Sequence, residues 1–355
     1  MTLFDPLPLR DVTLRNRIGV SPMCQYSSDD GFANDWHLVH LGQFAVGGAS
    51  VVLTEAIAVT ADGRISQQDL GIWKDEHVDF LTRIGRFVKA EGAVWGAQLA
   101  HAGRKASTIR PWDGGGSASV DAGGWTPIYG PSALPFDAAY QTPVALDAAG
   151  IARITTAFRD AATRALGAGM EMVEIHAAHG YLLHEFLSPL SNQRSDNYGG
   201  SFENRTRLVR EVVAAVRTVW PERLPISVRL SATDWTDGGW TPDETVALSK
   251  ILKGDGVDII DVSSGGNVPT AKIPIGASYQ VAFAERVRKE AGIHSGAVGL
   301  ITSPQQADSI VRTGQADMVF MARELLRDPH WPLRAARELR HDIAWPPQYE
   351  RAKLR

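Results

Sequence analysis

Residues 170–190 have the sequence MEMVEIHAAHGYLLHEFLSPL, which contains the pattern that decides the fold. The run from Met172 to His176 is short, apolar and rich in β-branched side chains, and it follows a helix-length amphipathic stretch near residues 147–167. A short buried strand next to helix-length segments is typical of a parallel sheet covered by helices.

The same unit recurs along the whole chain. Strand-like runs are RIGVS from Arg17, SVVLTEA from Ser50, AVWGAQL from Ala93, MVEIH from Met172, PISVRL from Pro225, VDIIDVSS from Val257, HSGAV from His294 and ADMVFMA from Ala316. Helical stretches are expected near residues 36–47, 75–91, 147–167, 202–219, 242–254, 280–291, 304–313 and 329–339. Eight strand–helix pairs predict an α/β protein built as one (β/α)8 TIM barrel. A doubly wound sheet is the competing fold, but SPMCQY after the first strand is not the glycine turn that it requires.

The barrel is expected to form a single domain over residues 1–355, with an N-terminal hairpin before the first barrel strand. Residues 100–146 do not fit a short connection, because they are rich in glycine, proline and aromatic residues and contain the patch GGGSAS. A loop of this length in a compact domain is usually functional or disordered. Since it follows the third strand, we interpret it as a lid over the catalytic end of the barrel.

Composition excludes several classes of protein. The net charge is −4, and the basic residues are scattered, so nucleic acid is not an expected partner. No uncharged apolar run approaches the roughly 18 residues of a membrane span, and the start of the chain does not resemble a signal peptide. The one cysteine, Cys24, allows no internal disulfide and fits a reducing cytoplasm.

Polar residues stand where most of the predicted strands end. They are Ser21, Glu55, Gln98, His176, Arg229, Ser263, Ser264 and Arg323. Barrel enzymes keep their active groups at this rim, and so many inward polar groups would be costly without a ligand to pair them. A large, polar, planar ligand is the simplest explanation.

The histidine pair that follows the fourth strand has three interpretations. His176 and His179 could bind a metal ion, but no HExxH helix or histidine-rich segment supplies a third ligand. They could be core histidines bonded to the backbone. They could also donate two hydrogen bonds to one substrate oxygen and stabilise the charge that develops there.

Longer motifs carry a resemblance to a known family. They are SPMCQYSSDDGFANDWHLVHL, QLAHAGRKAS, EIHAAHGYLLHEFLSPLSNQRSDNYGGSFENRTRL, DVSSGG, GAVGLI, RELLRDPHW and PPQYER. From about Phe4 to Arg351 the chain resembles the Old Yellow Enzyme family of flavin ene-reductases, in its bacterial thermophilic-like branch. The resemblance implies a single barrel that binds FMN non-covalently.

The resemblance also implies roles for the catalytic residues. His176 and His179 would hold the carbonyl oxygen of an activated alkene. Tyr181 would give a proton to the α-carbon after flavin N5 gives hydride to the β-carbon, which is a plausible task for a phenol acting as general acid. The alternative for Tyr181 is a packed ring after the strand.

Further residues match the family's cofactor positions. They are Ser21, Pro22, Met23, Cys24 and Ala56 along the flavin ring, Gln98 at its pyrimidine edge, Arg229 near N1, and Gly299, Ala322 and Arg323 at the phosphate. The family commonly has glycine where this chain has Ala322, and the added methyl group is tolerated if φ stays negative.

Two more residues match substrate positions of this branch. Tyr26 would reach toward the substrate, and Arg351 would extend into the site of a neighbouring subunit, which implies a homodimer or homotetramer. The alternative for Arg351 is a solvated chain end.

The sequence therefore predicts an FMN-dependent NAD(P)H:enone oxidoreductase that reduces activated alkenes, with NADPH favoured as the reductant and no metal. Two alternatives stay open. One is a phosphate-binding barrel lyase or aldolase without flavin, and the other is a flavin-binding barrel without catalysis.

Overall fold

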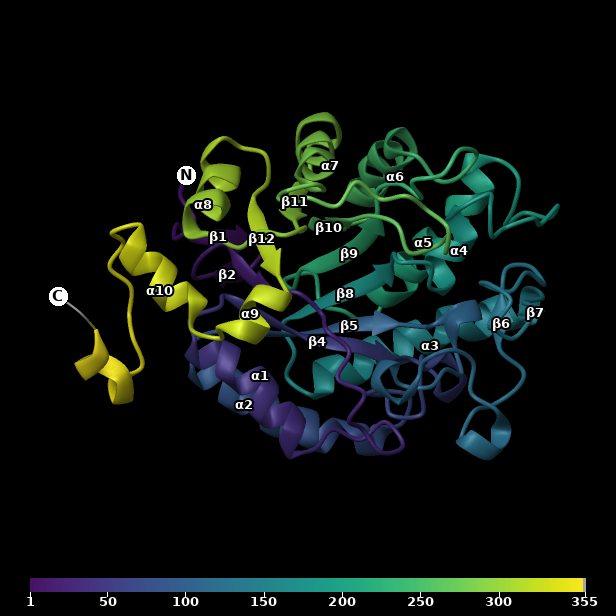
Figure 1. Ribbon diagram of the computed structural model, residues 1–355, viewed down its shortest axis with the longest axis horizontal. Coiled ribbons are helices and arrows are strands. Elements are labelled where there is room, and N and C mark those ends of the chain that lie inside the picture. Colours follow the sequence, from purple (N-terminus) through teal and green to yellow (C-terminus); the bar gives the residue numbers. More distant parts are fainter. Residues whose placement is uncertain (354–355) are drawn as a thin grey trace.

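Eight parallel strands close into a barrel in the computed structural model, which describes residues 1–353 (Figure 1). The strands are β3 (Ile18–Val20), β4 (Val51–Ala58), β5 (Val94–Ala100), β8 (Met172–Ala177), β9 (Ile226–Ser231), β10 (Ile259–Ser263), β11 (His294–Ala297) and β12 (Met318–Met321). Pairing of β12 with β3 closes the ring. Each strand overlaps the run that the sequence indicated and extends at most two residues beyond it, so the predicted (β/α)8 barrel is confirmed.

The barrel strands are buried on both faces. Every residue of β4, β5, β8, β9 and β10 is buried. Continuous apolar runs are the expected signature of parallel strands that are covered by helices on the outside and filled by side chains on the inside. A register shift between Leu53 and Ala56 breaks the regular pairing of β4 with β5.

Helices surround the barrel (Figure 1). The longer ones are α1 (Asp35–Val46), α2 (Val78–Ala90), α3 (Ala148–Gly167), α5 (Phe202–Arg217), α6 (Pro242–Gly254), α8 (Pro304–Arg312) and α10 (Trp331–Glu338). Their starts follow the sequence signals: Thr241 and Glu244 form a reciprocal capping box, and Ser303 caps α8 before Pro304. The stretch expected at 280–291 is α7 (Val281–Arg286), which continues as a π-helix over Val287–Ala291.

Two short helices were not anticipated. They are α4 (Leu182–Leu187) after β8 and α9 (Arg323–Arg327) after β12. With six and five residues, they are too short to show a helical hydrophobic period.

An antiparallel hairpin of β1 (Leu7–Leu9) and β2 (Val12–Leu14) precedes the barrel, as predicted. It packs at the end where the strands begin: the Asp11 amide donates to the Arg223 carbonyl, and Arg10 pairs with Asp258. The opposite end of the barrel, where the strands finish, is therefore the end that remains for a site.

The long segment after β5 has little regular structure. It contains the 3-10 turns Gly103–Lys105, Pro111–Asp113 and Val120–Ala122 and the two-residue strands β6 (Tyr129–Gly130) and β7 (Val144–Ala145). Further 3-10 turns lie at Ala61–Gly63, Asp75–His77 and, at the end of the chain, Pro347–Ala352 (η7).

Candidate active site

The loop that follows β8 is held in an unusual backbone conformation. His179 has φ +60° and Gly180 has φ +71°, and a positive φ is uncommon for a residue with a side chain. Two side chains fix this loop: the Gly180 amide donates to His184 Nδ1 at 2.8 Å, and the His179 amide donates to Ser231 Oγ at 2.9 Å. The turn therefore presents its side chains from a rigid base.

His176, His179 and Tyr181 form one cluster at the barrel mouth. The ring centroids of His176 and His179 are 5.3 Å apart, and those of His176 and Tyr181 are 5.1 Å apart, both in edge-to-face contact. Burial and the positive charge of Arg229 hold the pKa of each imidazole well below its ordinary value. Burial raises the pKa of Tyr181 well above 10. Near neutral pH the cluster therefore holds two neutral imidazoles and a protonated phenol.

One buried atom of this cluster lacks a protein partner. His176 Nδ1 makes no hydrogen bond within the described chain, whereas His179 Nε2 lies 2.7 Å from Ser263 Oγ. Among residues 1–353, no three His, Cys, Asp or Glu side chains are placed to hold a metal ion. The geometry thus favours hydrogen bonding to a ligand over metal binding.

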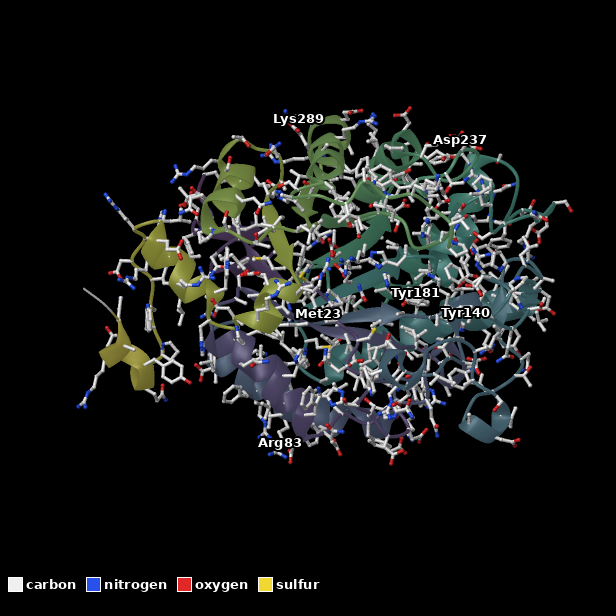
Figure 2. The ribbon with its side chains drawn as sticks, viewed as in Figure 1. Met23, Arg83, Tyr140, Tyr181, Asp237 and Lys289 are labelled. Carbon is white, nitrogen blue, oxygen red and sulfur yellow. The ribbon has the colours of Figure 1, made fainter. Side chains whose placement is uncertain are left out.

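Cys24 and Tyr26 lie on the loop that follows β3. Burial raises the pKa of both the thiol and the hydroxyl, and each group also acts on the pKa of the other. Tyr26 has φ +49°. The Glu55 carboxylate fixes the loop, because it accepts a hydrogen bond from the Gln25 amide at 3.0 Å. Figure 2 shows Met23 of the same loop, and Tyr181, in the interior of the view rather than at its rim.

The amide of Gln98 on β5 is oriented by a buried carboxylate. Gln98 Nε2 donates to Glu174 Oε1 at 2.8 Å, and Ser227 Oγ donates to Glu174 Oε2 at 2.8 Å. One N–H of the Gln98 amide is engaged by Glu174, which leaves its second N–H to donate to a ligand and its carbonyl oxygen to accept from one.

Arg229 on β9 is paired with another buried acid. Its Nε lies 3.1 Å from Asp261 Oδ2 on β10, and the two residues are opposite each other in the strand register. Arg229 is also opposite His176 on β8. The guanidinium is thus a fixed positive charge beside the imidazole cluster.

A cavity of about 190 Å³ extends from Arg229 to the ends of the last two strands. It is lined by Ser21, Arg229, Gly299, Ala322 and Arg323, which brings together five of the predicted cofactor residues. Gly299 has φ +115°, and a Cβ atom there would come within 3.1 Å of the Tyr279 ring, so only glycine fits. Ala322 has φ −113°, the negative value that accommodates its methyl group.

A second, small cavity lies beside Tyr181. Ala56, Ala102 and Asp69 line it together with the Tyr181 ring. Burial raises the pKa of Asp69 to about 7, and the Glu55 carboxylate adds to the shift. Ala56 therefore lies near the phenol, at the end of β4 where the sequence placed it.

Arg351 lies away from this mouth. It is exposed on η7, which is beyond α10 at the outer edge of the molecule (Figure 1). Tyr349 of the same segment packs edge-to-face on His330, with ring centroids 5.6 Å apart. The structure thus gives Arg351 no contact with the site of its own chain.

The residues at the mouth fit FMN. The unpartnered His176 Nδ1, the free acceptor of Gln98 and the Arg229 charge match a planar ring with donors, acceptors and a site that becomes negative. At the far end of the cavity, Gly299 allows close backbone approach and Arg323 can make a charge-assisted contact to a phosphate.

Two residues at the mouth were not among the predicted catalytic, substrate or cofactor residues, although the HAGRK motif indicated that Lys105 lies near the substrate or the lid. Lys105 Nζ donates to the His179 carbonyl at 2.8 Å and also to the Gly266 carbonyl, and burial lowers its pKa to about 8. Its signal was its place in HAGRK after β5. Asp261 was hidden inside the motif DVSSGG, where nothing in the sequence shows that it faces Arg229.

No helix among the described residues is long and apolar enough to cross a membrane.

Comparisons with known proteins identify the family of this chain. A sequence model of the NADH:flavin oxidoreductase / NADH oxidase family matches residues 2–342. NADPH dehydrogenase of Geobacillus sp. (strain WCH70) is 51% identical over 98% of both chains, and NADPH dehydrogenase of Bacillus subtilis (strain 168) is 46% identical over 98% of both chains. The structure of morphinone reductase in complex with tetrahydroNAD has a TM-score of 0.80 and 26% identity, covering 98% of this chain and 93% of that chain. The chain belongs to the NADH:flavin oxidoreductase / NADH oxidase family, the Old Yellow Enzyme family that its motifs resemble, and is an FMN-dependent NAD(P)H dehydrogenase.

Proposed function

We propose that this dehydrogenase is an ene-reductase, which reduces the C=C bond of α,β-unsaturated carbonyl or nitro compounds at the expense of NAD(P)H. The observation that carries the proposal is the cluster of two neutral imidazoles and one protonated phenol at the barrel mouth. Bound FMN supplies the hydride-transfer chemistry. The NADPH dehydrogenase names of the relatives favour NADPH as the reductant.

His176 and His179 bind the oxygen of the substrate. A neutral imidazole carries one N–H donor, and two such donors aimed at one carbonyl or nitro oxygen stabilise the negative charge that develops there. His176 Nδ1 has no protein partner in the described chain, and the His179 ring, whose Nε2 lies 2.7 Å from Ser263 Oγ, keeps its other nitrogen for a ligand.

Tyr181 supplies the proton. Its raised pKa keeps the phenol protonated, and its ring is in contact with His176, so the hydroxyl is next to a substrate held by the imidazoles. A general acid must be within hydrogen-bond reach of the carbon or oxygen that it protonates. The cavity beside Tyr181 has a volume of about 10 Å³, which is room for about one water molecule, so we place the rest of the substrate outside it, toward Tyr26 on the neighbouring loop.

The remaining mouth residues hold FMN. Gln98 accepts from the pyrimidine edge, and Arg229 stabilises negative charge at that edge. The ring packs along the β3 loop and the end of β4, and the phosphate lies at the ends of β11 and β12. The residues concerned are Ser21, Pro22, Met23, Cys24, Ala56, Gly299, Ala322 and Arg323.

Residues 100–146 cover this site as a lid. Lys105 Nζ lies 4.1 Å from the centroid of Phe136 and 5.4 Å from that of Tyr181, so one cation contacts both the segment and the catalytic turn. We further propose a homodimer or homotetramer in which Arg351 enters the site of a neighbouring copy, and a cytoplasmic location in keeping with the single cysteine.

The Tyr181→Phe variant tests the proposal. In stopped-flow experiments with cyclohexenone, it should slow re-oxidation of the reduced enzyme by about 10²-fold or more, the usual contribution of a general acid. Reduction of the flavin by NADPH should stay nearly unchanged, because that step needs no phenolic proton.

The matched control is Tyr198→Phe, which removes a hydroxyl that donates to Glu211 at 3.0 Å outside the site. It should leave both half-reactions unchanged. Equal slowing of both half-reactions in Tyr181→Phe would reject the proton-donor role, and failure of the unmodified enzyme to reduce any activated alkene would reject the ene-reductase function.

A further inference from the structure

A buried carboxyl group at the barrel mouth has no role in the mechanism above. Asp261 is fully buried, and neither of its oxygens has a hydrogen-bond partner in the described chain. Its Oδ2 lies 3.1 Å from Arg229 Nε, but that nitrogen is also without a well-aligned hydrogen bond. An unsatisfied buried acid of this kind is costly, so a stabilising role alone does not account for it.

The charges around Asp261 come from two neighbouring strands. Arg229 faces it from β9, and Glu174 acts on it from β8. On its other side β11 contributes Gly296 and Ala297, and α7, which packs on β10, contributes the buried Val281 and Ala284, none of which titrates.

Two carboxyl groups therefore share one guanidinium. Both Glu174 oxygens accept hydrogen bonds, from Gln98 and Ser227, whereas those of Asp261 accept none. Burial raises the pKa of Asp261 to about 8; Arg229 opposes the shift, and the Glu174 carboxylate adds to it. Burial raises the pKa of Glu174 as well, but the hydrogen bonds from Ser227 and Gln98 oppose that shift, and Asp261 has no such bonds. We therefore assign the proton of this pair to Asp261.

We propose that Asp261 is a positioning residue that sets the net charge of its pair with Arg229 and binds a proton when the flavin is reduced. With FMN bound at this site, NADPH would supply two electrons and one proton as hydride, and Arg229 would face the negative charge that this reduction adds. The added negative charge favours the protonated form of Asp261, and the second proton comes from solvent. The inference rests on the position of FMN proposed above.

The pH dependence of the flavin midpoint potential tests this proposal in the unmodified holoenzyme. Without Asp261, formation of an anionic reduced flavin takes up one proton for each two electrons. With Asp261, we expect an uptake of between one and two protons for each two electrons from about pH 7.5 to about pH 9, because the carboxyl group titrates in this range. A count of one throughout this range would overturn the proposal.

The Asp261→Asn variant should take up one proton for each two electrons over the same range. Its potential should match that of the unmodified enzyme near about pH 6, where Asp261 is neutral, and lie above it near about pH 9, where a negative charge has been removed. A variant that keeps the higher proton count, or that follows the unmodified enzyme at both pH values, would also overturn the proposal.

Asp317→Asn is the matched control. Asp317 is another buried acid 3.1 Å from an arginine Nε, that of Arg288, but it lies where β12 begins, at the opposite end of the barrel. This variant should leave the potential and its pH dependence unchanged.

Arg229→Gln separates this inference from the proposed site. If FMN lies where we place it, loss of the guanidinium lowers the midpoint potential. If Arg229→Gln has no effect, the proposed position of FMN fails. If Arg229→Gln lowers the potential and Asp261→Asn behaves like Asp317→Asn, only the role of Asp261 fails.

Discussion

Each end of the barrel contains a buried aspartate beside an arginine, but the two aspartates differ in their hydrogen bonds and in the direction of their pKa shifts. At the end where the strands begin, Asp317 accepts from Arg288 Nε at 3.1 Å and from the Ser295 amide at 3.0 Å, and its pKa is lowered. At the mouth, Asp261 is just as close to Arg229 but accepts no hydrogen bond, and its pKa is raised. Asp317 is thus fully paired within the chain, whereas Asp261 is left without a hydrogen bond.

This contrast extends to the histidines. His294, beside Asp317, lies 3.4 Å from that carboxylate and is half exposed. His176 is buried next to Arg229, a positive charge that opposes protonation of its ring. Polar groups that the fold leaves unsatisfied, and that carry perturbed pKa values, are characteristic of functional sites.

The largest effect is expected from removing the imidazoles at the mouth. The His176→Ala, His179→Ala double variant should lower the rate of alkene reduction by about 10²–10³-fold, the usual cost of losing an oxyanion-binding donor. It should also abolish the long-wavelength charge-transfer band that a bound phenol gives with the oxidised flavin. His294→Ala, at the end where the strands begin, should change neither the rate of alkene reduction nor the charge-transfer band. A double variant that still gives the band would contradict oxyanion binding by this pair.

Removing Asp317, at the end where the strands begin, is expected to lower the stability of the folded protein. Asp317→Ala leaves the Ser295 amide and Arg288 without their acceptor, which should destabilise the folded state by about 2–3 kcal/mol. Because the folded-state pKa of Asp317 is lowered, the stability that it contributes is present above its unfolded pKa and is lost as pH falls through the folded value. The deficit of the variant should therefore shrink on acidification, as measured by urea unfolding of the holoenzyme.

Asp261→Asn should show the opposite sign in the same measurement. Its folded-state pKa is raised, so the unmodified protein loses stability as pH rises from the unfolded value toward the folded one. Asp261→Asn has no carboxyl group to ionise at this position, so its stability relative to the unmodified protein should increase as pH rises. If the two aspartates respond to pH in the same direction, the contrast between the two ends is wrong.

The sequence predicted which residues lie at the mouth better than it predicted which side chains contact one another there. Strand alternation placed Gln98, His176 and Arg229 at strand ends, and long motifs supplied their roles. That Asp261 faces Arg229 depends on the register of β10 against β9, which no local pattern encodes. The same holds for Glu174, whose contact with Gln98 depends on the pairing of β8 with β5.

Local signals were also too weak for short elements. The helices α4 and α9 contain six and five residues, and each begins directly at a site loop, where the preceding turn rather than an amphipathic repeat sets its direction. The positive φ of His179 is likewise fixed by tertiary hydrogen bonds to Ser231 and, through Gly180, to His184.

The smallest effect is expected from the C-terminal segment, which belongs to neither end of the barrel. Arg351 is exposed on η7, and within the described chain it forms no ion pair, whereas Lys353 pairs with Asp342. If a second copy receives this arginine, Arg351→Ala should raise KM for cyclohexenone by about 3- to 10-fold, a loss of roughly 1 kcal/mol, with kcat nearly unchanged.

Lys353→Ala on the same segment is the control, and it should leave KM unchanged because its cation is already satisfied within the chain. Mixed oligomers give a sharper test, since they pair Arg351→Ala subunits with Tyr181→Phe subunits. In such an oligomer, the Arg351→Ala subunit keeps Tyr181, and its Tyr181→Phe partner keeps Arg351. If Arg351 acts in the neighbouring site, the site of the Arg351→Ala subunit should therefore regain its low KM. If Arg351→Ala leaves KM unchanged at every protein concentration, the mouth is complete within one chain and the polar groups that it leaves unsatisfied are those of a self-contained site.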